Sequence, residues 1–312
     1  MVNVALRIAQ PEDAEVMLGI IGAAFRARQR IDPPPEALSE TIDTLRRKLK
    51  PPRFGVIASV DGRDVGCLVV SFRPDGAAML HRVSVVPGSR RLGVAAYMVR
   101  STALLLADQG VSRLQLMARA ELDVVQRWWT SHGFSIDHEV FNGVIMSVDL
   151  PRPIQVPTAH AMQLLGVRLA GVLQAGDLVL LNGELGAGKT TLTQGIGAGL
   201  DVDGQVISPT FVLSRIHKPI DEDKVPLVHV DAYRISSVAE LDDLDLEASM
   251  PGAITVIEWG AGLAEELAPS RLEIEIRRSD SPEDDTRTVY LLGIGPRWAG
   301  IDIEQKMADV WR

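Results

Sequence analysis

The chain has 312 residues, enough for two domains that each bury a core of their own. Hydrophobic residues make up 46% of the chain, yet no apolar run is long enough for a membrane-spanning helix, and "MVNVALRIAQPEDAE" lacks the features of a signal peptide. A lone cysteine, Cys67, excludes an intramolecular disulfide and favours a reducing, cytoplasmic location. We expect Cys67 to lie buried in a strand.

Charge is divided unevenly between the two halves of the chain. Residues 1–150 carry 18 Lys and Arg against 16 Asp and Glu, a balance of +2, whereas residues 151–312 carry 14 against 25, a balance of −11. Neutralisation of phosphates supplies most of the affinity of proteins for nucleic acid. The acidic half is therefore a poor nucleic-acid binder by itself, and a role near RNA would have to pass through a partner protein.

The first half predicts alternating strands and helices. Its first strand precedes a helix whose first turn contains Pro11, and two β-rich runs around Asp61-Gly62 predict a hairpin. Gly110 is expected to end a long amphipathic helix. The later elements are a strand over 78–86, a helix over 92–110, a strand over 112–118, a helix over 121–133 and two short closing strands.

Three prolines in "DLPRPIQVPT", residues 149–158, predict a linker, and we place a domain boundary between 150 and 151. After it, Thr158 is expected to cap a helix. A strand over 177–181 then runs into a glycine-rich loop and a helix. Further strands are expected over 210–216, 226–233, 253–259, 271–276 and 288–294, and a terminal helix over 301–312.

The glycine-rich loop has the spacing Gly183-x-x-x-x-Gly188-Lys189-Thr190 between a strand and a helix. Its backbone N–H groups would converge on an anion at the positive end of the helix. Lys189 would contact the β- and γ-phosphates of ATP, and the Thr190 hydroxyl would bind Mg²⁺. The expected ATP-binding residues are Gly183, Glu184, Leu185, Gly186, Ala187, Gly188, Lys189, Thr190 and Thr191.

Other polar residues follow apolar strands of the same half. Asp231 ends one strand, which we expect next to the strand before the loop, as a metal-binding carboxylate or as a turn former. Thr210 is a candidate sensor of Mg²⁺ or γ-phosphate, or a structural residue. Glu258 is a candidate to orient water or bind magnesium, and Trp259 is either core or contact surface.

Four segments in this order, "GELGAGKTT", "SPTF", "HVDAYR" and "IEWG", resemble the TsaE family of P-loop ATPases across about residues 152–295. The resemblance implies a role in making N6-threonylcarbamoyladenosine at position 37 of tRNA, with TsaD-like and TsaB-like partners and tRNA contacted only through them. It implies catalytic roles for Lys189, Glu258 and Trp259, and metal binding by Thr190, Asp231 and Glu258. The family's usual "DLYR" is "DAYR" here.

A second loop, "RRLGVA", follows a strand and "VVP" and opens a helix, which again is the geometry of an anion site. It resembles the acetyl-CoA loop of GNAT-type N-acetyltransferases, whose order of elements residues 1–150 follow. The resemblance implies acetyl-CoA binding by Val86, Arg90, Arg91, Leu92, Gly93, Val94 and Ala95. The expected fold is α/β: a GNAT-like mixed-sheet domain, 1–150, then a P-loop NTPase sheet with flanking helices, 151–312.

The sequence of the first half favours binding of acetyl-CoA more strongly than it favours transfer of the acetyl group. The tyrosine that commonly protonates the CoA thiolate in this family is replaced by Trp129, which is no general acid. His81, His132 and Glu121 are substitutes as acid or base, or ordinary surface residues.

Two main readings follow for the whole chain. In the first, an ATPase of tRNA modification carries an acetyl-CoA-binding domain. In the second, the chain is chiefly an acetyltransferase with a regulatory nucleotide-binding half. A partner-recruiting scaffold in the first half and a small-molecule kinase in the second are further alternatives, although no acceptor site or lid for a kinase is evident.

Overall fold

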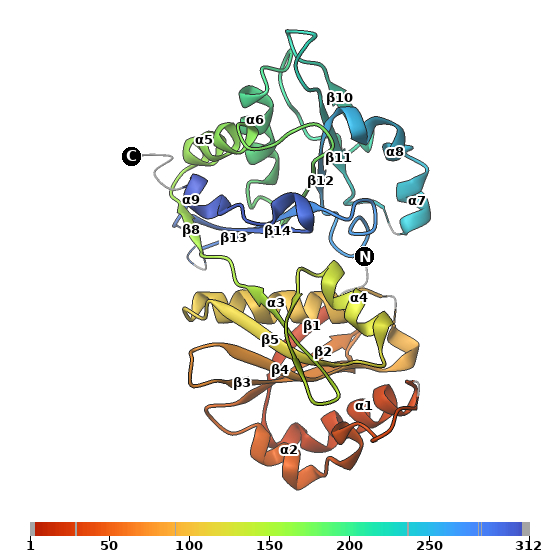
Figure 1. Ribbon diagram of the computed structural model, residues 1–312. Helices are drawn as coiled ribbons and strands as arrows, with labels where there is room; N and C mark the ends of the chain where they lie inside the picture. The colour runs from red at the N-terminus through yellow and green to blue at the C-terminus, as the bar shows by residue number, and fades with distance from the viewer. Residues whose placement is uncertain are drawn as a thin grey trace. The chain divides into compact units, whose positions relative to one another are not determined.

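The computed structural model describes residues 4–28, 30–90, 92–235, 237–279, 281 and 283–307. Contacts divide the chain into two compact units, Met1–Leu150 and Pro151–Arg312. Each unit contains one mixed seven-stranded sheet with helices packed on it (Figure 1). The expected α/β class, with one mixed sheet in each half of the chain, is confirmed.

The N-terminal sheet has the strand order β1-β2-β3-β4-β5-β7-β6. Its strands are β1 (Val4–Ala9), β2 (Phe54–Val60), β3 (Arg63–Phe72), β4 (Ala78–Val85), β5 (Arg113–Arg119), β6 (Ser135–Val140) and β7 (Gly143–Asp149). Asp61 and Gly62 have φ values of 48° and 75°, which confirms the predicted β2–β3 hairpin. Strands β4 and β5 are parallel and pair only as far as Leu80 and Leu116. The rest of β4 therefore leaves β5, and the sheet opens there.

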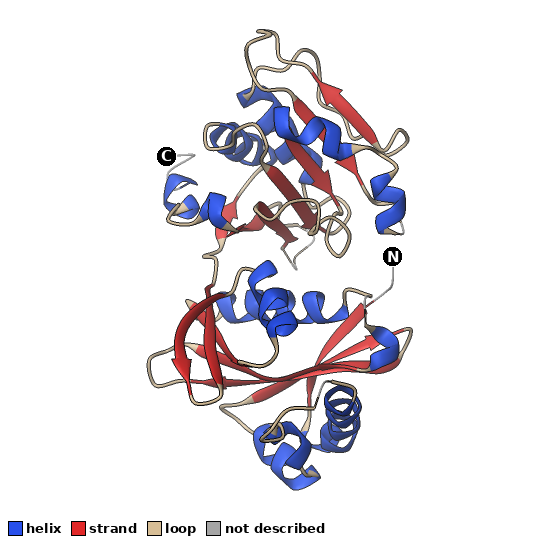
Figure 2. Cartoon of the chain, turned by 45° about the vertical axis from the view of Figure 1, so that its right-hand side comes forward, coloured by secondary structure: helices blue, strands red, loops and turns tan. Residues whose placement is uncertain are grey.

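Helices cover both faces of this sheet, α1 and α2 on one face and α3 on the other (Figures 1 and 2). The helices are α1 (Ala14–Arg26), α2 (Ile42–Lys48), α3 (Val94–Asp108) and α4 (Asp123–Ser131), with short 3₁₀ turns η1 (Pro11–Asp13), η2 (Glu36–Ser39) and η3 (Pro87–Ser89). Helix α2, which Thr41 caps, was not predicted from the sequence. Cys67 lies fully buried in the core under α1, as expected.

The C-terminal sheet has the order β10-β11-β12-β9-β13-β14-β8, with β11, β12, β9 and β13 parallel. Its strands are β8 (Ile154–Val156), β9 (Leu178–Gly183), β10 (Ser214–His217), β11 (Leu227–Asp231), β12 (Ile254–Glu258), β13 (Arg271–Arg278) and β14 (Arg287–Ile294). Two expectations are wrong here. The proline-rich segment contains β8, which pairs with β14, and β10 begins only at Ser214 because residues 210–213 form turns.

Side chains of β9 alternate between two cores. Val179 and Leu181 enter the core under α5 (Ala159–Ala170) and α6 (Lys189–Gly199), whereas Leu178 and Leu180 enter a second core with Leu241 and Leu246. The remaining elements are α7 (Val238–Asp242), α8 (Leu246–Ser249), α9 (Ile303–Met307) and the 3₁₀ turns η4 (Met250–Gly252) and η5 (Pro296–Trp298). A sheet covered on both faces holds its strand ends rigidly for a site.

Two predicted helix ends can be compared with the structure. The Thr158 hydroxyl accepts a 3.1 Å hydrogen bond from the Ala161 N–H, which confirms the cap of α5. Of the predicted terminal helix, α9 covers Ile303–Met307, and residues 308–312 lie outside the described part of the chain. Within the described ranges, every helix is too short or too polar to cross a membrane.

Candidate functional site

The loop between β9 and α6 has a backbone that only glycine adopts easily. Gly183, Gly186 and Gly188 have φ values of 142°, 75° and 110°. A Cβ atom at Gly183 would lie 2.3 Å from the Ile276 carbonyl oxygen, whereas one at Gly186 would meet nothing within 4 Å. The first glycine therefore packs against β13, and the second faces open space. Of the other expected ATP-binding residues, Glu184 and Leu185 are exposed, Ala187 is buried and Thr191 is half-buried.

Lys189, the first residue of α6, points back into the loop. Its Nζ donates to the carbonyl oxygens of Gly183 at 2.7 Å and Glu184 at 2.9 Å, and it lies 3.7 Å from the centre of the Trp259 ring. Burial lowers the pKa of Lys189, although the charges of Glu258 and Asp231 oppose this effect. The ammonium is thus partly desolvated and held by carbonyl oxygens that phosphate oxygens can replace.

Glu258 at the end of β12 connects two other elements. Thr190 Oγ1 donates to Glu258 Oε1 at 2.9 Å, and His229 Nε2 lies 2.8 Å from the same oxygen. All three side chains are buried or half-buried, and His229 is fully buried, with no partner for Nδ1 among the described residues. Sequence reasoning missed His229, although a histidine in the apolar run "PLVHVDAY" was a signal for a polar partner.

Asp231 lies beside Glu258 in the parallel register of β11 and β12. Thr210 donates to Asp231 Oδ2 at 2.6 Å, Ser208 donates to the same oxygen at 3.0 Å, and the Tyr233 N–H donates to Oδ1. The expectation that this strand adjoins the loop strand is wrong, because β12 separates β11 from β9. Glu258 therefore occupies the strand end next to the loop, and Asp231 the one beyond it.

Trp259 directly follows Glu258 and has a left-handed φ of 63°, which is unusual for a bulky residue. Its N–H donates to the Leu181 carbonyl at 2.9 Å, and its ring centre lies 5.2 Å from that of Tyr233. This backbone turn places the ring against Lys189. Trp259 is therefore part of the site as well as half-buried beside the second core.

The oxygen atoms at these strand ends suit a hard cation. Thr190, Asp231 and Glu258 offer hydroxyl and carboxylate oxygens, which are the ligands that Mg²⁺ prefers. Thr190 gives its proton to Glu258 and so keeps oxygen lone pairs for another partner. The donor set therefore fits magnesium beside a bound phosphate chain.

The N-terminal loop also precedes a helix with a left-handed glycine. Gly93, the residue before α3, has φ 71° and no side-chain cap. Arg90 points away from α3, because its Nη2 donates to the Ala24 carbonyl at 3.1 Å. Arg91, also expected to bind acetyl-CoA, lies outside the described residues. The other expected residues differ in exposure: Val94 is buried, Val86 and Ala95 are half-buried, and Leu92 is exposed.

Trp129 belongs to the core of the N-terminal unit. It is 6% exposed and packs edge-on against Trp128 and Phe134. The suggested substitutes as acid or base lie on different elements. His81 on β4 bonds Ser71 at 2.7 Å, His132 stacks on Trp128 at the end of α4, and Glu121 pairs with Arg119. Burial, aided by Arg82, lowers the pKa of His81 to about 4, so its imidazole is neutral at pH 7.

Two families match separate parts of the chain. "Threonylcarbamoyl adenosine biosynthesis protein TsaE" matches residues 156–289, and "Acetyltransferase (GNAT) family" matches residues 23–134. A TsaE protein of Streptomyces coelicolor is 53% identical over 144 residues, covering 46% of this chain and 97% of the relative. A TsaE protein of Bacillus subtilis is 37% identical over 130 residues, covering 41% of this chain and 77% of that protein.

Solved structures resemble each unit separately. Bacillus subtilis YdiB is 25% identical with a TM-score of 0.39, covering 51% of this chain and 92% of its own. The PaiA N-acetyltransferase of Thermoplasma acidophilum, solved with coenzyme A, is 13% identical with a TM-score of 0.43, covering 47% of this chain and 99% of its own.

Proposed function

The chain belongs to the TsaE family through its C-terminal half and carries a GNAT acetyltransferase domain in front of it, and on this premise we propose that it is an ATPase of tRNA threonylcarbamoyladenosine synthesis. We propose that TsaD-like and TsaB-like proteins are its partners and that tRNA is contacted only through them. The net charge of −11 on residues 151–312 supports this arrangement, because such a surface repels a phosphate backbone.

The convergence of Lys189, Thr190 and Glu258 carries this proposal. We propose that when ATP binds, oxygens of its β- and γ-phosphates replace the two loop carbonyl oxygens as hydrogen-bond acceptors of Lys189 Nζ. Thr190, Asp231 and Glu258 would hold Mg²⁺, which would neutralise charge on the phosphate chain. The Trp259 ring contacts Lys189 and helps to hold it in position, and His229 helps to orient Glu258.

ATP hydrolysis tests the proposal directly. The full chain should hydrolyse ATP slowly alone and faster with TsaD-like and TsaB-like proteins. Lys189→Ala should reduce the stimulated rate by about 100-fold or more, because it removes the cation that contacts the transferred phosphoryl group. Lys218→Ala is the control, since Lys218 is exposed and its side chain has no partner among the described residues. A stimulated rate unchanged by Lys189→Ala would refute the proposed mechanism.

The N-terminal unit supports a second activity, binding of acetyl-CoA. Gly93 leaves the first turn of α3 uncapped, and β4 loses its pairing with β5 before it reaches the loop. Backbone N–H groups at such a helix start attract a pyrophosphate. Because Trp129 is a buried core residue, no proton donor stands at that position, and we propose binding that is not matched by fast acetyl transfer.

Calorimetry with acetyl-CoA, with Mg·ADP at saturation to occupy the C-terminal loop, tests the second activity. Gly93→Val should abolish binding, because a β-branched residue does not adopt a φ of 71° easily. Gly76→Val is the matched control, with φ 83° and open space around it in a turn before β4. Fast acetylation of an amine would favour acetyltransferase as the main activity.

A further inference from the structure

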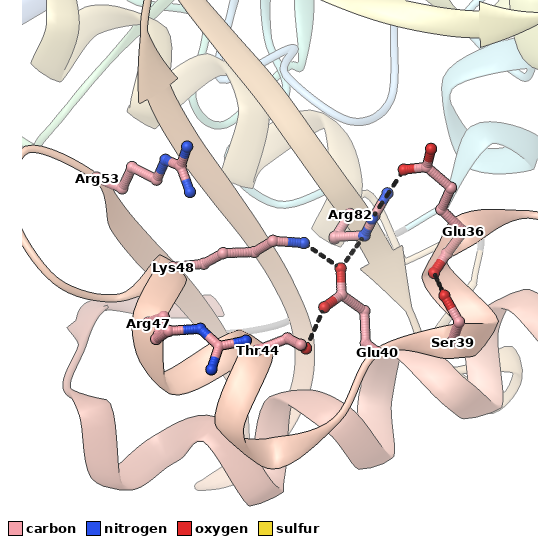
Figure 3. A pocket seen from close by; sticks show the side chains of 8 residues that line it. All are labelled: Glu36, Ser39, Glu40, Thr44, Arg47, Lys48, Arg53 and Arg82. Atoms are coloured by element: carbon pink, nitrogen blue, oxygen red, sulfur yellow. Dashed lines mark hydrogen bonds and ion pairs between the residues drawn. The ribbon is translucent and has the colours of Figure 1, made fainter.

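A pocket of about 300 Å³ lies in the N-terminal unit where α2 and η2 face β4 (Figure 3). Its volume is at the lower end of the range for small-molecule sites. Most of its wall is charged. The charged lining residues are Glu36, Glu40, Arg47, Lys48, Arg53 and Arg82.

Glu40 anchors one wall of this pocket. Its side chain is only 3% exposed and accepts hydrogen bonds from Lys48, from Arg82 Nε at 2.7 Å and from Thr44 Oγ1 at 2.6 Å. Burial alone would raise the pKa of Glu40, but these hydrogen bonds and the charge of Arg82 lower it to about 2. Glu40 is therefore an ionised structural group that fixes two cations in the wall.

Arg82 reaches Glu40 through an unusual backbone. It has a left-handed φ of 56° where the register of β3 and β4 shifts. Strain of this kind in a non-glycine residue often occurs at binding sites, where the surrounding structure maintains it. The bulge thus supports the position of the Arg82 guanidinium in the pocket.

Two further cations line the pocket without a partner. Arg47 and Arg53 are exposed, and neither side chain has a hydrogen bond or ion pair among the described residues (Figure 3). The lining holds four cations against two carboxylates, and one of these, Glu36, is 90% exposed and 3.5 Å from Arg82. The pocket therefore has an excess of positive charge, and the cations without a carboxylate partner are the guanidinium groups of Arg47 and Arg53.

We propose that this pocket binds a small molecule through a carboxylate or phosphate group. Guanidinium groups present paired N–H donors that match the oxygens of both groups, and two unpaired arginines beside a fixed Lys48–Glu40–Arg82 cluster form a prepared anion site. The limited volume favours a metabolite-sized ligand over a folded protein.

Strand β4 connects this pocket to the proposed coenzyme loop. Arg82 lies within β4, which ends at Val85 shortly before Arg90 and Gly93. A ligand in this pocket would therefore lie along the strand that leads to the proposed coenzyme loop, whereas the anion binding itself does not rest on the proposed acetyl-CoA binding.

The test uses the full chain with Mg·ADP at saturation and constant ionic strength, so that the C-terminal loop is occupied. Inorganic phosphate and succinate are titrated separately by calorimetry. We expect one saturable site for at least one probe, and the probe that binds more tightly identifies the preferred group. Arg47→Gln combined with Arg53→Gln should weaken binding about tenfold or more, because two charge-assisted contacts are lost.

Arg46→Gln is the matched control, since Arg46 lies next to Arg47 on α2 but pairs with Asp43 and does not line the pocket. It should leave binding unchanged. The absence of saturable binding, or equal binding by the double variant, would overturn the proposal. Acetyl-CoA binding is measured on the same double variant and should be retained. This measurement distinguishes a failure of the proposed coenzyme site from a failure of the proposed anion pocket.

Discussion

Gly93 and Gly188 begin helices in the same way, each in a left-handed conformation after a strand, with φ values of 71° and 110°. Their surroundings differ. Behind Gly188, Lys189 donates to a loop carbonyl and Thr190 donates to Glu258, whereas the residue behind Gly93 is the buried apolar Val94. A helix start with a glycine is enough to attract an anion. Side chains from neighbouring strands decide whether chemistry follows.

The largest effect is expected from Trp129→Ala in the N-terminal unit. Loss of this buried ring should lower the free energy of unfolding of that unit by about 3–5 kcal/mol. Calorimetric unfolding measures the change, and Phe141→Ala is the control because Phe141 is 90% exposed. ATP hydrolysis should stay intact; a parallel loss would show that the two units do not act separately.

Glu258→Gln is expected to have the next largest effect. It keeps the shape of the side chain but removes the charge that accepts from Thr190, so the rate of ATP hydrolysis should fall about 100-fold. Steady-state kinetics with the partner proteins present measures this. Glu266→Gln, at an exposed position, should not change the rate, and a similar rate in both variants would exclude Glu258 from the reaction.

Glu40→Gln should destabilise the N-terminal unit at pH 7 by about 2 kcal/mol, because Lys48 and Arg82 lose their shared carboxylate. The folded-state pKa of Glu40 is about 2 against an ordinary 4.5, so its contribution is complete above pH 4.5 and is lost as pH falls toward 2. Unfolding free energies of wild type and variant should therefore converge in acid. If the difference in unfolding free energy were the same at low pH as at pH 7, the ionised Glu40 would not be the source of this stability.

The smallest effects are expected from alanine at Gly93 and at Gly186, whose φ values of 71° and 75° are nearly equal. Each substitution should cost about 1 kcal/mol of backbone strain in its own unit. Titrations should show Gly93→Ala weakening acetyl-CoA binding and Gly186→Ala weakening ATP binding. Weakening of the wrong ligand by either variant would reverse the assignment of the loops.

The sequence predicted those features that depend on local chemistry. The Asp61-Gly62 hairpin and the Thr158 cap follow from backbone preferences of a few residues, and both are confirmed. The position of β12 between β11 and β9 could not be predicted, because parallel order is set by packing of distant segments. Helix α2 was missed because it is short and flanked by prolines at 33–35 and 51–52, so the helical spacing of its apolar residues does not stand out in the sequence.

The candidate site was predicted only where it lies at motif positions. Lys189 and Glu258 were expected, but the contribution of His229 was not, since β11 is buried along its whole length and the sequence does not say which residue a histidine inside it contacts. The left-handed backbone of Trp259 could not be predicted either, because no local sequence pattern indicates it; in the folded chain the Trp259 N–H donates to Leu181 of the adjacent strand β9.

Strand β8 has a practical consequence for anyone who divides this protein. The family match begins at residue 156, but β8 starts at Ile154 and covers β14, and Arg152 just before it is bonded to Glu304 of α9 at 2.6 Å. A fragment cut at the family border would lose this strand and expose the backbone of β14 along a sheet edge. Exposed edges pair with other chains and aggregate. A C-terminal fragment starting at Pro151 should stay monodisperse where one starting at 157 does not.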